Sequence, residues 1–419
     1  MDYEVKDIEL APEGKRAIDW VEQHMPTLMH IKQEFSEEKP LEGLKVSAAL
    51  HVEAKTASLM RTLKAGGAKI AITGCNPLST IDSVAAELAN ENINVFAWRG
   101  EAEEDYYKNL DRVLDQEPDL LIDDGADLIA RIHSERSELL SRVKGGTEET
   151  TTGVNRLRAM SSENELKFPV IAVNDTPAKR LFDNRFGTAE STLQAIMTIT
   201  NSLIAGKNVV VVGYGFVGRG IALRAKGLGA TVTVVETDPI RALEASMMGF
   251  NVTSMNKAAK TGDIFITATG NIHVIRKKHF KKMKDGAILC NSGHFNVEIN
   301  LQELEELSVN KKEILDDIEE FQLENGKRIH VLAQGRLVNL AGEKALGHPA
   351  EIMDMSFSLQ ALSLKHLAEN EEELENKVHE VPREIDRRVA EIKLKSRGIE
   401  LETPTKEQNN YSKSWKLGT

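Results

Sequence analysis

A run of four valines followed by spaced glycines is the feature that most constrains how this chain can fold. Val209–Val212 has branched side chains on both faces, which predicts a strand buried inside a parallel sheet. Gly213, Gly215 and Gly218 follow in the G-x-G-x-x-G spacing, which permits a tight turn, a close approach of backbone to a pyrophosphate, and close helix packing. A helix over about 219–228 would direct its N-terminal amides at those phosphates.

The second strand of this motif supports a dinucleotide site. Residues 231–235 are apolar and β-branched, and they end at Glu236. An acidic residue roughly 20 positions after the glycines can bind a ribose diol and repel the extra phosphate of NADP. We therefore predict bound NAD, with a purely structural glycine turn as the alternative. Because the motif lies in mid-chain, substrate-binding structure is expected on both sides of it.

Composition limits the remaining possibilities. A chain of 419 residues with 41% hydrophobic and 28% charged residues predicts a globular protein of two domains. The net charge of -12 argues against nucleic acid or an anionic membrane as the main partner. No apolar run approaches the roughly 20 residues that span a bilayer. Two cysteines, Cys75 and Cys290, fit a reducing cytoplasm and predict neither disulfides nor a metal site.

Strands and helices alternate along the chain, which predicts an α/β fold of two doubly wound, Rossmann-like domains with parallel sheets and a short C-terminal tail. The polar segment 145–153 is expected to be a loop, and charged helices are expected around Glu371 and over 385–396. The predicted units are a substrate-binding domain with its first part at 1–187, an NAD-binding Rossmann domain at 188–341, a return to the substrate-binding domain at 342–396, and a tail at 397–419.

Polar and charged residues recur where predicted strands end, and in the loops that follow. Each one alone has an ordinary structural explanation, such as a turn or a solvated helix face. Their shared placement predicts a ligand crevice, because the carboxyl ends of a doubly wound sheet form one. The residues are His51, Asp124, Glu149, Lys179, Asp183, Asn184, His294 and His348.

Together with the glycine motif, these segments resemble the adenosylhomocysteinase family. The resemblance extends from residue 50 to residue 349 and keeps the order of many motifs. The carrying segments are Leu50–Thr56, Gly74–Thr80, Asp123–Gly125, Glu148–Gly153, Asp183–Gly187, Gly293–Phe295, Gly335–Leu340 and Gly347–Pro349.

The resemblance implies a reaction on a nucleoside thioether. Bound NAD+ oxidises the ribose 3′-hydroxyl, which acidifies the C4′ hydrogen and allows elimination of the thiol at C5′. Water then adds, and the ketone is reduced again. Lys179 would help remove the 3′-hydroxyl proton, for which it needs a depressed pKa. Asp124 and His51 would handle the C4′ proton and the thiol or water.

The same resemblance assigns the remaining contacts. Asp183 would bind the ribose and Glu149 the 2′-hydroxyl region, while Asn184 would orient Lys179 or the nicotinamide. His294 and His348 would lie over the substrate, with His348 in the loop that gates entry. Further substrate contacts are Glu53, Lys55, Thr56 and Met353. The predicted cofactor contacts are Thr150, Thr151, Thr152, Asn184, Gly213, Gly215, Phe216, Val217, Gly218, Glu236, Asn271, Asn339 and His348.

Two residues of the segment Leu50–Thr56 depart from the usual pattern of the family. The usual enzymes have threonine and glutamate or glutamine where this chain has Glu53 and Lys55. A charged lysine only donates hydrogen bonds, so it suits the 6-oxo group of hypoxanthine, and Glu53 suits the N1–H. This pair resembles the base-reading motif of S-inosylhomocysteine hydrolases. The alternative is that Lys55 pairs with Glu53 or faces solvent, and that adenine is bound in another way.

Two other classes of protein compete with the hydrolase. An NAD-dependent nucleoside dehydrogenase would release its reduced cofactor, and a non-catalytic relative would have lost ribose-site residues. The presence of Lys179, Asp183 and Asn184 favours the hydrolase over the non-catalytic relative. The expected protein is a cytoplasmic homo-oligomer, a tetramer or a dimer, acting on a small-molecule nucleoside thioether.

Overall fold

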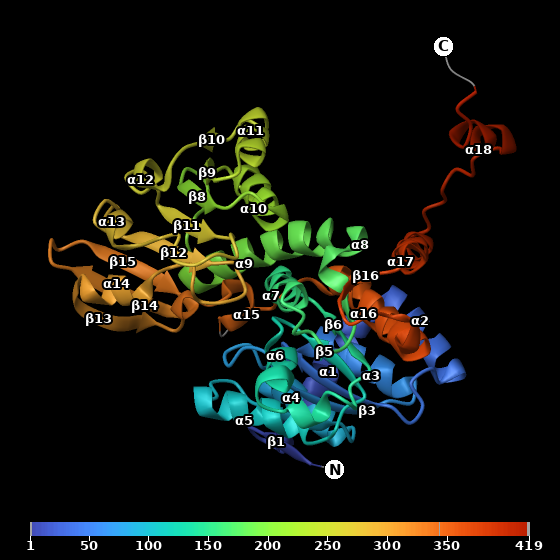
Figure 1. Cartoon of the computed structure of the whole chain (residues 1–419). Coiled ribbons are helices and arrows are strands. Elements are labelled where there is room, and N and C mark those ends of the chain that lie inside the picture. The colour runs from blue at the N-terminus through green and yellow to red at the C-terminus, as the bar shows by residue number, and fades with distance from the viewer. Residues whose placement is uncertain (1, 343, 417–419) are drawn as a thin grey trace.

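The computed structural model describes residues 2–342 and 344–416. These residues form two lobes, each with an eight-stranded sheet at its centre (Figure 1). In sheet A the strands are all parallel. In spatial order they are β1 (Tyr3–Val5), β4 (Asn94–Ala97), β3 (Lys69–Gly74), β2 (Lys45–Leu50), β5 (Leu120–Asp123), β6 (Gly145–Glu148), β7 (Val170–Ala172) and β16 (Val378–Glu380).

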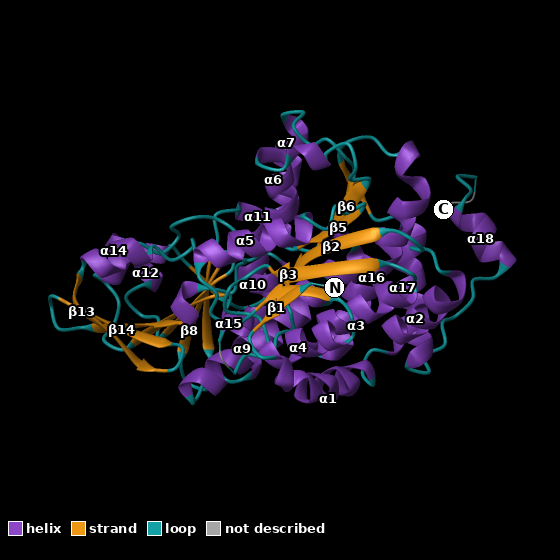
Figure 2. Cartoon of the chain, turned by 90° about the horizontal axis from the view of Figure 1, so that it is seen from below, coloured by secondary structure: helices purple, strands orange, loops and turns teal. Residues whose placement is uncertain are grey.

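Helices lie on both sides of sheet A, as Figure 2 shows. The strand order reverses between β2 and β5, so the crevice of a doubly wound sheet is expected at the carboxyl ends of these two strands. The helices of this lobe are α1 (Ala11–Glu22), α2 (Pro26–Glu38), α3 (Ala54–Ala65), α4 (Asp82–Asn90), α5 (Glu103–Leu114), α6 (Asp127–Ser134), α7 (Thr151–Ser162), α8 (Pro177–Arg180), α16 (Ala350–Asn370) and α17 (Arg383–Ser396).

Sheet B reverses its strand order between β8 and β11. Its strands, in spatial order, are β10 (Asn251–Val252), β9 (Thr231–Val235), β8 (Asn208–Val212), β11 (Ile264–Thr267), β12 (Ala287–Asn291), β15 (Arg328–Leu332), β14 (Ile318–Leu323) and β13 (Ser308–Leu315). Its helices are α9 (Thr188–Thr200), α10 (Phe216–Gly227), α11 (Pro239–Met247), α12 (Met255–Ala258), α13 (Lys277–Phe280), α14 (Leu301–Glu306) and α15 (Val338–Ala341).

The prediction of two doubly wound α/β domains is confirmed, with one difference at the edge of sheet B. There β14 pairs antiparallel with both β13 and β15. Only Asp316 and Asp317 separate β13 from β14, and a connection that short permits only an antiparallel hairpin.

The valine run packs as its sequence predicts. Val209 and Val211 belong to one hydrophobic core of sheet B, and Val210 and Val212 belong to the core on its other face. Neighbouring side chains of a strand point to opposite faces, so a strand covered on both sides needs apolar residues at every position. Helix α10 begins at Phe216, earlier than the predicted 219, and it follows Gly215 directly.

The expected loop at 145–153 is partly wrong, because Gly145–Glu148 forms the buried strand β6. The two glycines explain both the strand and the error. An added Cβ at Gly145 would lie 2.8 Å from the carbonyl oxygen of Pro169, and one at Gly146 would lie 3.3 Å from Leu121. The strand can therefore lie this close to its neighbours only if positions 145 and 146 have no side chains, which removes the apolar signal by which strands are recognised.

The C-terminal part of the chain returns to the first lobe. The expected charged helix around Glu371 is instead one 3-10 turn, Glu371–Glu373, which leads into β16. The helix expected over 385–396 matches α17. The predicted tail contains α18 (Lys406–Ser412), which stands away from both lobes (Figure 1); residues 417–419 of this tail lie outside the described part.

Candidate active site

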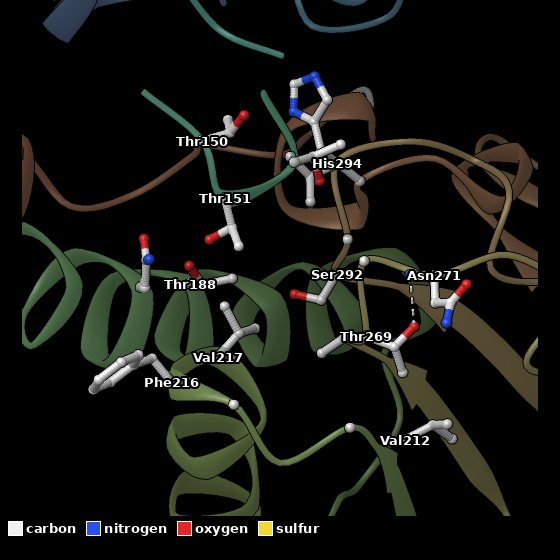
Figure 3. A pocket seen from close by; sticks show the side chains of 18 of the residues that line it. Thr150, Thr151, Thr188, Val212, Phe216, Val217, Thr269, Asn271, Ser292 and His294 are labelled. Carbon is white, nitrogen blue, oxygen red and sulfur yellow. Dashed lines mark hydrogen bonds between the residues drawn. The ribbon is translucent and has the colours of Figure 1, made fainter. Parts of the chain in front are cut away.

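The carboxyl ends of the two sheets open onto one cavity of about 1180 Å³, lined by residues of both lobes. Figure 3 shows the part where Thr150, Thr151 and Thr188 face Phe216 and Val217 of α10. The predicted site residues found in the lining are His51, Glu53, Thr56, Asp124, Glu149, Thr150, Thr151, Thr152, Lys179, Asp183, Asn184, Gly213, Gly215, Phe216, Val217, Glu236, Asn271, His294, Asn339, His348 and Met353. Lys55 and Gly218 are not part of it.

A buried ammonium group lies at the centre of the predicted ribose site. Lys179 Nζ is 3.2 Å from Asp183 Oδ1 and 3.3 Å from Glu149 Oε1. It also donates a 2.8 Å hydrogen bond to Asn184 Oδ1. Lys179 comes from the short helix α8, and Asp183 and Asn184 come from the π-helical turn Asp183–Gly187 that follows. A ribose diol entering this cluster would meet one donor and several acceptors.

The charge state of this cluster differs from the expectation. Burial acts to lower the pKa of Lys179, but the carboxylates of Asp183 and Glu149 outweigh it, and the net pKa is raised. The carboxylates thus act against the depressed lysine pKa that the reaction needs, and the depression stays a prediction for the closed site beside NAD. Burial also raises the pKa of Glu149 to about 7, although Lys179 acts to lower it. Glu149 is thus the group of this cluster that exchanges a proton near neutral pH.

Asp183 joins this cluster to the predicted gate. Its Oδ1 lies 3.2 Å from His348 Nδ1, and its Oδ2 accepts a 2.7 Å hydrogen bond from Ser356 Oγ. Despite burial, which acts to raise it, the pKa of Asp183 is lowered by Lys179 and His348. A stable carboxylate therefore connects the ribose site with the loop that carries His348.

Four residues that hydrogen-bond the predicted polar groups were missed in the sequence. Ser356 and Gln360 lie one turn apart on α16, and Gln360 Nε2 donates to Glu149 Oε2 at 2.5 Å. Asn174 accepts from Asn184 at 3.0 Å, and Ser79 bonds His51 Nδ1 at 2.7 Å. Ser356 and Gln360 could have been found in the sequence, because they are polar residues four positions apart in an otherwise buried, apolar helix.

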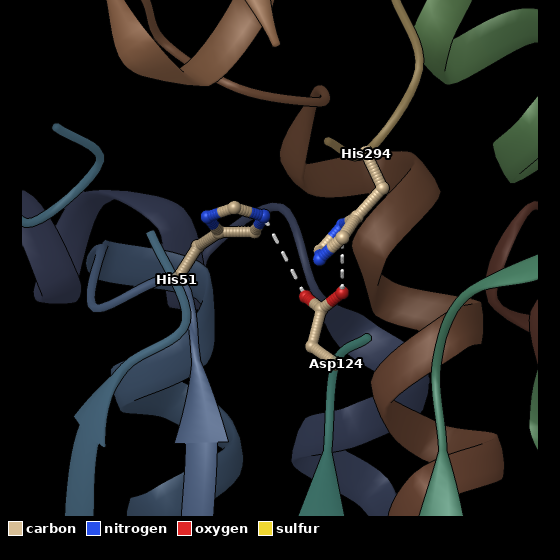
Figure 4. A group of neighbouring side chains, drawn as sticks. All are labelled: His51, Asp124 and His294. Atoms are coloured by element: carbon tan, nitrogen blue, oxygen red, sulfur yellow. Dashed lines mark ion pairs between the residues drawn. The ribbon is translucent and has the colours of Figure 1, made fainter. Parts of the chain in front are cut away.

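A second cluster lies where the strand order of sheet A reverses. His51 follows β2 and Asp124 follows β5, while His294 reaches across from the other lobe (Figure 4). His51 Nε2 is 3.6 Å from Asp124 Oδ2, and His294 Nδ1 is 3.6 Å from Asp124 Oδ1. Burial lowers the pKa of His51 to about 4, and it also lowers that of His294, against the effect of Asp124. Both rings are therefore neutral at pH 7.

The two unusual residues of the base motif contact each other. Glu53 lies at the N-terminus of α3, where its carboxylate accepts from the backbone amides of Lys55 and Thr56. Lys55 Nζ lies 2.7 Å from Glu53 Oε2 and donates at 2.7 Å to the carbonyl of Leu346. Glu53 lines the cavity, whereas Lys55 is not among its lining residues.

The glycine turn fits a dinucleotide. Gly213 has φ of +99°, and a Cβ added there would lie 2.6 Å from a backbone oxygen of Ala268. At Gly215 the nearest neighbour of an added Cβ is 4.0 Å away, which leaves room for a phosphate. No side chain caps the start of α10, so its first amides remain available as donors. Gly218 serves the packing instead, since a Cβ there would lie 2.0 Å from the Gly213 oxygen.

Glu236 is suited to the adenosine ribose of NAD. It follows β9 at the cavity wall, and its carboxylate accepts from the backbone amides of Tyr214, Thr237 and Asp238. Burial acts to raise its pKa, but these amides lower it, so the group stays ionised. The fold and the site therefore define an NAD-binding Rossmann enzyme that acts on a ribose-containing small molecule.

Comparisons with known proteins identify the family. Residues 2–139 match the model of S-adenosyl-L-homocysteine hydrolase, and residues 184–345 match the model of its NAD-binding domain. The chain is 58% identical to the adenosylhomocysteinase of Sulfurisphaera tokodaii over the whole of both chains. It is equally 58% identical to the S-inosyl-L-homocysteine hydrolase of Methanopyrus kandleri, over all of this chain and 98% of the other.

The chain belongs to the S-adenosyl-L-homocysteine hydrolase family and is an NAD-dependent hydrolase. One solved structure, a dipicolinate synthase chain from Bacillus halodurans, shares the fold with a TM-score of 0.50 and 17% identity, covering 78% of this chain and 99% of its own. Among the described residues, no helix has the length and apolar composition needed to cross a bilayer.

We predict that Glu236→Gln weakens NAD binding by roughly tenfold or more, because a hydrogen bond to a charged group is worth about 1.5–3 kcal/mol. Calorimetric titration of the stripped protein with NAD would measure this. The control is Glu305→Gln, which changes an exposed carboxylate of α14. Equal NAD affinity in both variants would show that Glu236 does not contribute to NAD binding.

Proposed function

We propose that this chain hydrolyses S-inosyl-L-homocysteine to inosine and L-homocysteine, with S-adenosyl-L-homocysteine as the alternative substrate. Bound NAD would supply reversible oxidation of the ribose 3′ carbon. The observation that carries the reaction is the buried cluster of Lys179, Asp183 and Glu149, because it places a proton carrier between a carboxylate that stays ionised and one that titrates near neutral pH.

We assign Lys179 the transfer of the 3′-hydroxyl proton. Its ammonium is stabilised in the ligand-free protein, so it must first give up a proton. Glu149, 3.3 Å away and with a pKa of about 7, can hold that proton only once bound substrate and cofactor have lowered the pKa of Lys179 below that of Glu149. Lys179 would then accept the hydroxyl proton and return it when the ketone is reduced. Asn184 supports this role, since its Oδ1 fixes the position of Lys179 Nζ.

We assign the C4′ proton and the leaving thiol to the pair of His51 and Asp124. His51 is neutral at pH 7, so its Nε2 can accept a proton. Burial raises the pKa of Asp124, against the lowering effects of His294 and Lys179, which eases exchange of a proton between the two groups. His294 and His348 would close over the substrate, and Met353 and Thr56 would complete its pocket.

We expect Lys179→Ala to lower turnover by about 10²- to 10⁴-fold, the usual contribution of a positioned proton-transfer group. NAD should stay bound, because the glycine turn and Glu236 are unchanged. Thiol release and NAD content, measured on the same preparation, would check both statements. Lys167→Ala, at an exposed lysine, is the control.

A near-normal rate in Lys179→Ala would contradict the proton-transfer role. Net accumulation of NADH by the unmodified protein would instead indicate a dehydrogenase, because a hydrolase of this type returns the hydride in every cycle.

The preference for hypoxanthine rests on Glu53 and Lys55. Glu53 lines the cavity as a carboxylate paired with an ammonium, and it can accept the N1–H of hypoxanthine. Lys55 has three donors, of which Glu53 and the Leu346 carbonyl take two. The third N–H donor of Lys55 is available to a 6-oxo group if the side chain moves into the cavity. Adenine N1 carries no hydrogen, so it cannot donate a hydrogen bond to the Glu53 carboxylate.

We predict that hypoxanthine substrates exceed adenine substrates roughly tenfold or more in kcat/KM, because a mismatched buried polar group costs about 1–3 kcal/mol. The double change of Glu53→Thr and Lys55→Glu should shift preference toward adenine. Threonine also caps helices, so α3 should keep its N-terminal cap. Each single change should be worse than the double, because it breaks the Glu53–Lys55 pair.

Initial rates of thiol release from both substrates, measured side by side, provide the test. Lys15→Met, at an exposed lysine paired with Asp19, is the control for a lost ion pair. Equal rates on both substrates, unchanged by the double substitution, would show that these side chains do not select the base.

We further infer a cytoplasmic homo-oligomer, a dimer or a tetramer. Both cysteines are free and buried, which suits a reducing compartment. Tyr411 and Trp415 of the C-terminal segment are 56% and 89% exposed, although large aromatic side chains are usually covered. A second copy would cover them. Light scattering should give a mass of two or four chains, and a monomer would contradict this proposal.

A further inference from the structure

Two buried carboxyl groups lie next to the two acids that face the substrate cavity. Asp124 and Glu149 line this cavity, whereas Asp123 and Glu148, which directly precede them in the chain, are not among its lining residues. Strands β5 and β6 pair with Asp123 opposite Glu148, and both of these side chains are fully buried. Neighbouring side chains of a strand point to opposite faces, so each strand end can direct one acid at the cavity and bury the other. The proposed reaction gives neither buried acid a role.

One oxygen of Glu148 joins the turns that carry the two cavity acids. Glu148 Oε1 accepts hydrogen bonds from the backbone amide of Gly125 at 2.9 Å and from both the backbone amide and the hydroxyl of Thr150 at 2.8 Å. Gly125 follows Asp124, and Thr150 follows Glu149. The backbone bonds between β5 and β6 end at the Glu149 amide, and beyond it the Glu148 side chain connects the two turns.

The carboxyl group of Glu148 packs against Gly153 in the first turn of α7. A Cβ added to Gly153 would lie 2.2 Å from Glu148 Cδ and Oε1, and 2.5 Å from its Oε2. The backbone amide of Gly153 donates to Thr150 Oγ1 at 3.0 Å, and the hydroxyl hydrogen of Thr150 goes to Glu148. A larger residue at position 153 would displace the carboxyl group. Glycine is therefore required here by Glu148, although alanine would favour the helix.

The charge state of Glu148 suits a fixed hydrogen-bond acceptor. Its Oε2 is buried and has no hydrogen-bond partner among the described residues. A negative charge on that oxygen would be costly, because a buried charge needs partners. Burial, with Asp123 and Asp124 acting in the same direction, raises the pKa of Glu148 well above its usual range, although the amides of Gly125 and Thr150 act to lower it. The carboxyl group is therefore neutral at pH 7, with Oε1 as its carbonyl oxygen and the acidic hydrogen on Oε2.

We propose that Glu148 is a positioning residue of the reaction, which sets the separation of Asp124 and Glu149 through the hydrogen bonds of its Oε1. This inference deepens the proposed function, because it rests on the roles assigned there to Asp124 at the C4′ proton and to Glu149 at the ribose. Both acids must act on one sugar ring, so a shift of the substrate cannot offset a change in their separation. Misplacement by about 1 Å can lower a rate by roughly 10²-fold. Loss of the Glu148 side chain should therefore slow the chemical steps more than it weakens substrate binding.

Three substitutions separate the reach of this side chain from its acidity. Glu148→Ala removes the accepting oxygen, and we expect kcat to fall by roughly 10²-fold while KM changes by less than about threefold. Glu148→Gln keeps the length and an accepting oxygen, so kcat should stay within about threefold of the unmodified protein. Glu148→Asp keeps the acid but is shorter by a methylene group, and it should resemble Glu148→Ala. Thiol release per bound NAD, measured over a range of substrate concentrations with the full chain, gives kcat and KM for each variant.

The contact with Gly153 provides an independent test. Gly153→Ala should displace the Glu148 carboxyl group and lower kcat by about tenfold or more, even though alanine is the better helix former. Added to Glu148→Ala, the same change should lower kcat by less than about twofold, because the atoms that the new Cβ would meet are gone. Residues in contact are also non-additive in the free energy of unfolding. Denaturant titrations of the unmodified protein, both single variants and the double variant therefore test the contact without any substrate.

The matched control is Glu87→Ala, which removes another buried carboxyl group of the same lobe. Glu87 belongs to α4, is 3% exposed, and accepts a hydrogen bond from Asn90 Nδ2 at 3.1 Å. It is not among the lining residues of the cavity. Its loss should leave kcat per bound NAD within about twofold of the unmodified protein, because kcat reports on interactions made in the transition state.

A near-normal kcat in Glu148→Ala, or an equal loss in the control, would overturn the proposal. Full activity in Glu148→Asp with none in Glu148→Gln would overturn it too, since it would indicate a proton donor. If Glu148→Ala fails to fold, as judged by circular dichroism and NAD content, Gly153→Ala and the comparison of Glu148→Gln with Glu148→Asp still decide. Failure of the unmodified protein to hydrolyse either thioether would contradict the proposed function. Strictly additive unfolding free energies at positions 148 and 153 would contradict only the contact on which this proposal rests.

Discussion

The buried ammonium of Lys179 is the interaction on which the rest of the site depends. A charge this far from water is tolerated only when partners compensate it, and here Asp183, Glu149 and Asn184 do so. These partners come from the loop after β6 and from the π-helical turn, while Ser356 and Gln360 of α16 satisfy the carboxylates in turn. Folding must therefore bring these segments together before any substrate is present, and the cluster proposed to bind the ribose is preorganised.

The two sheets decide where that site can be. Each sheet reverses its strand order once, and the crevices at these two points face the same cavity. One cavity can therefore hold the cofactor and the substrate in contact with each other, although neither lobe encloses both molecules. Gly125 lies where the lobes approach each other, since a Cβ added there would be 2.4 Å from His294 Nε2, and its φ of +110° favours glycine. One glycine thus allows a histidine of the cofactor lobe to reach the substrate side.

The sequence predicted those parts of the fold that have a strong local signal. The valine run forms a strand and the glycine turn leads into a helix as expected, because burial on two faces and tight backbone approach leave clear patterns. Gly145–Glu148 and the β13–β14 hairpin were missed, since neither has the apolar pattern of a buried strand. The raised pKa of Lys179 and the His51–Asp124–His294 geometry could not be predicted, because both arise from distances between segments remote in the chain.

Base selection is the property that overall similarity cannot determine. Relatives with either name are 58% identical to this chain, so overall identity does not distinguish the two bases. The Glu53 carboxylate has little freedom to adapt, because it caps α3 and pairs with Lys55 at 2.7 Å. A group fixed by three partners discriminates by its position and polarity rather than by adjusting to each base. If Glu53 contacts the base as proposed, the same contacts that stabilise the start of α3 also restrict which purine the site can accept.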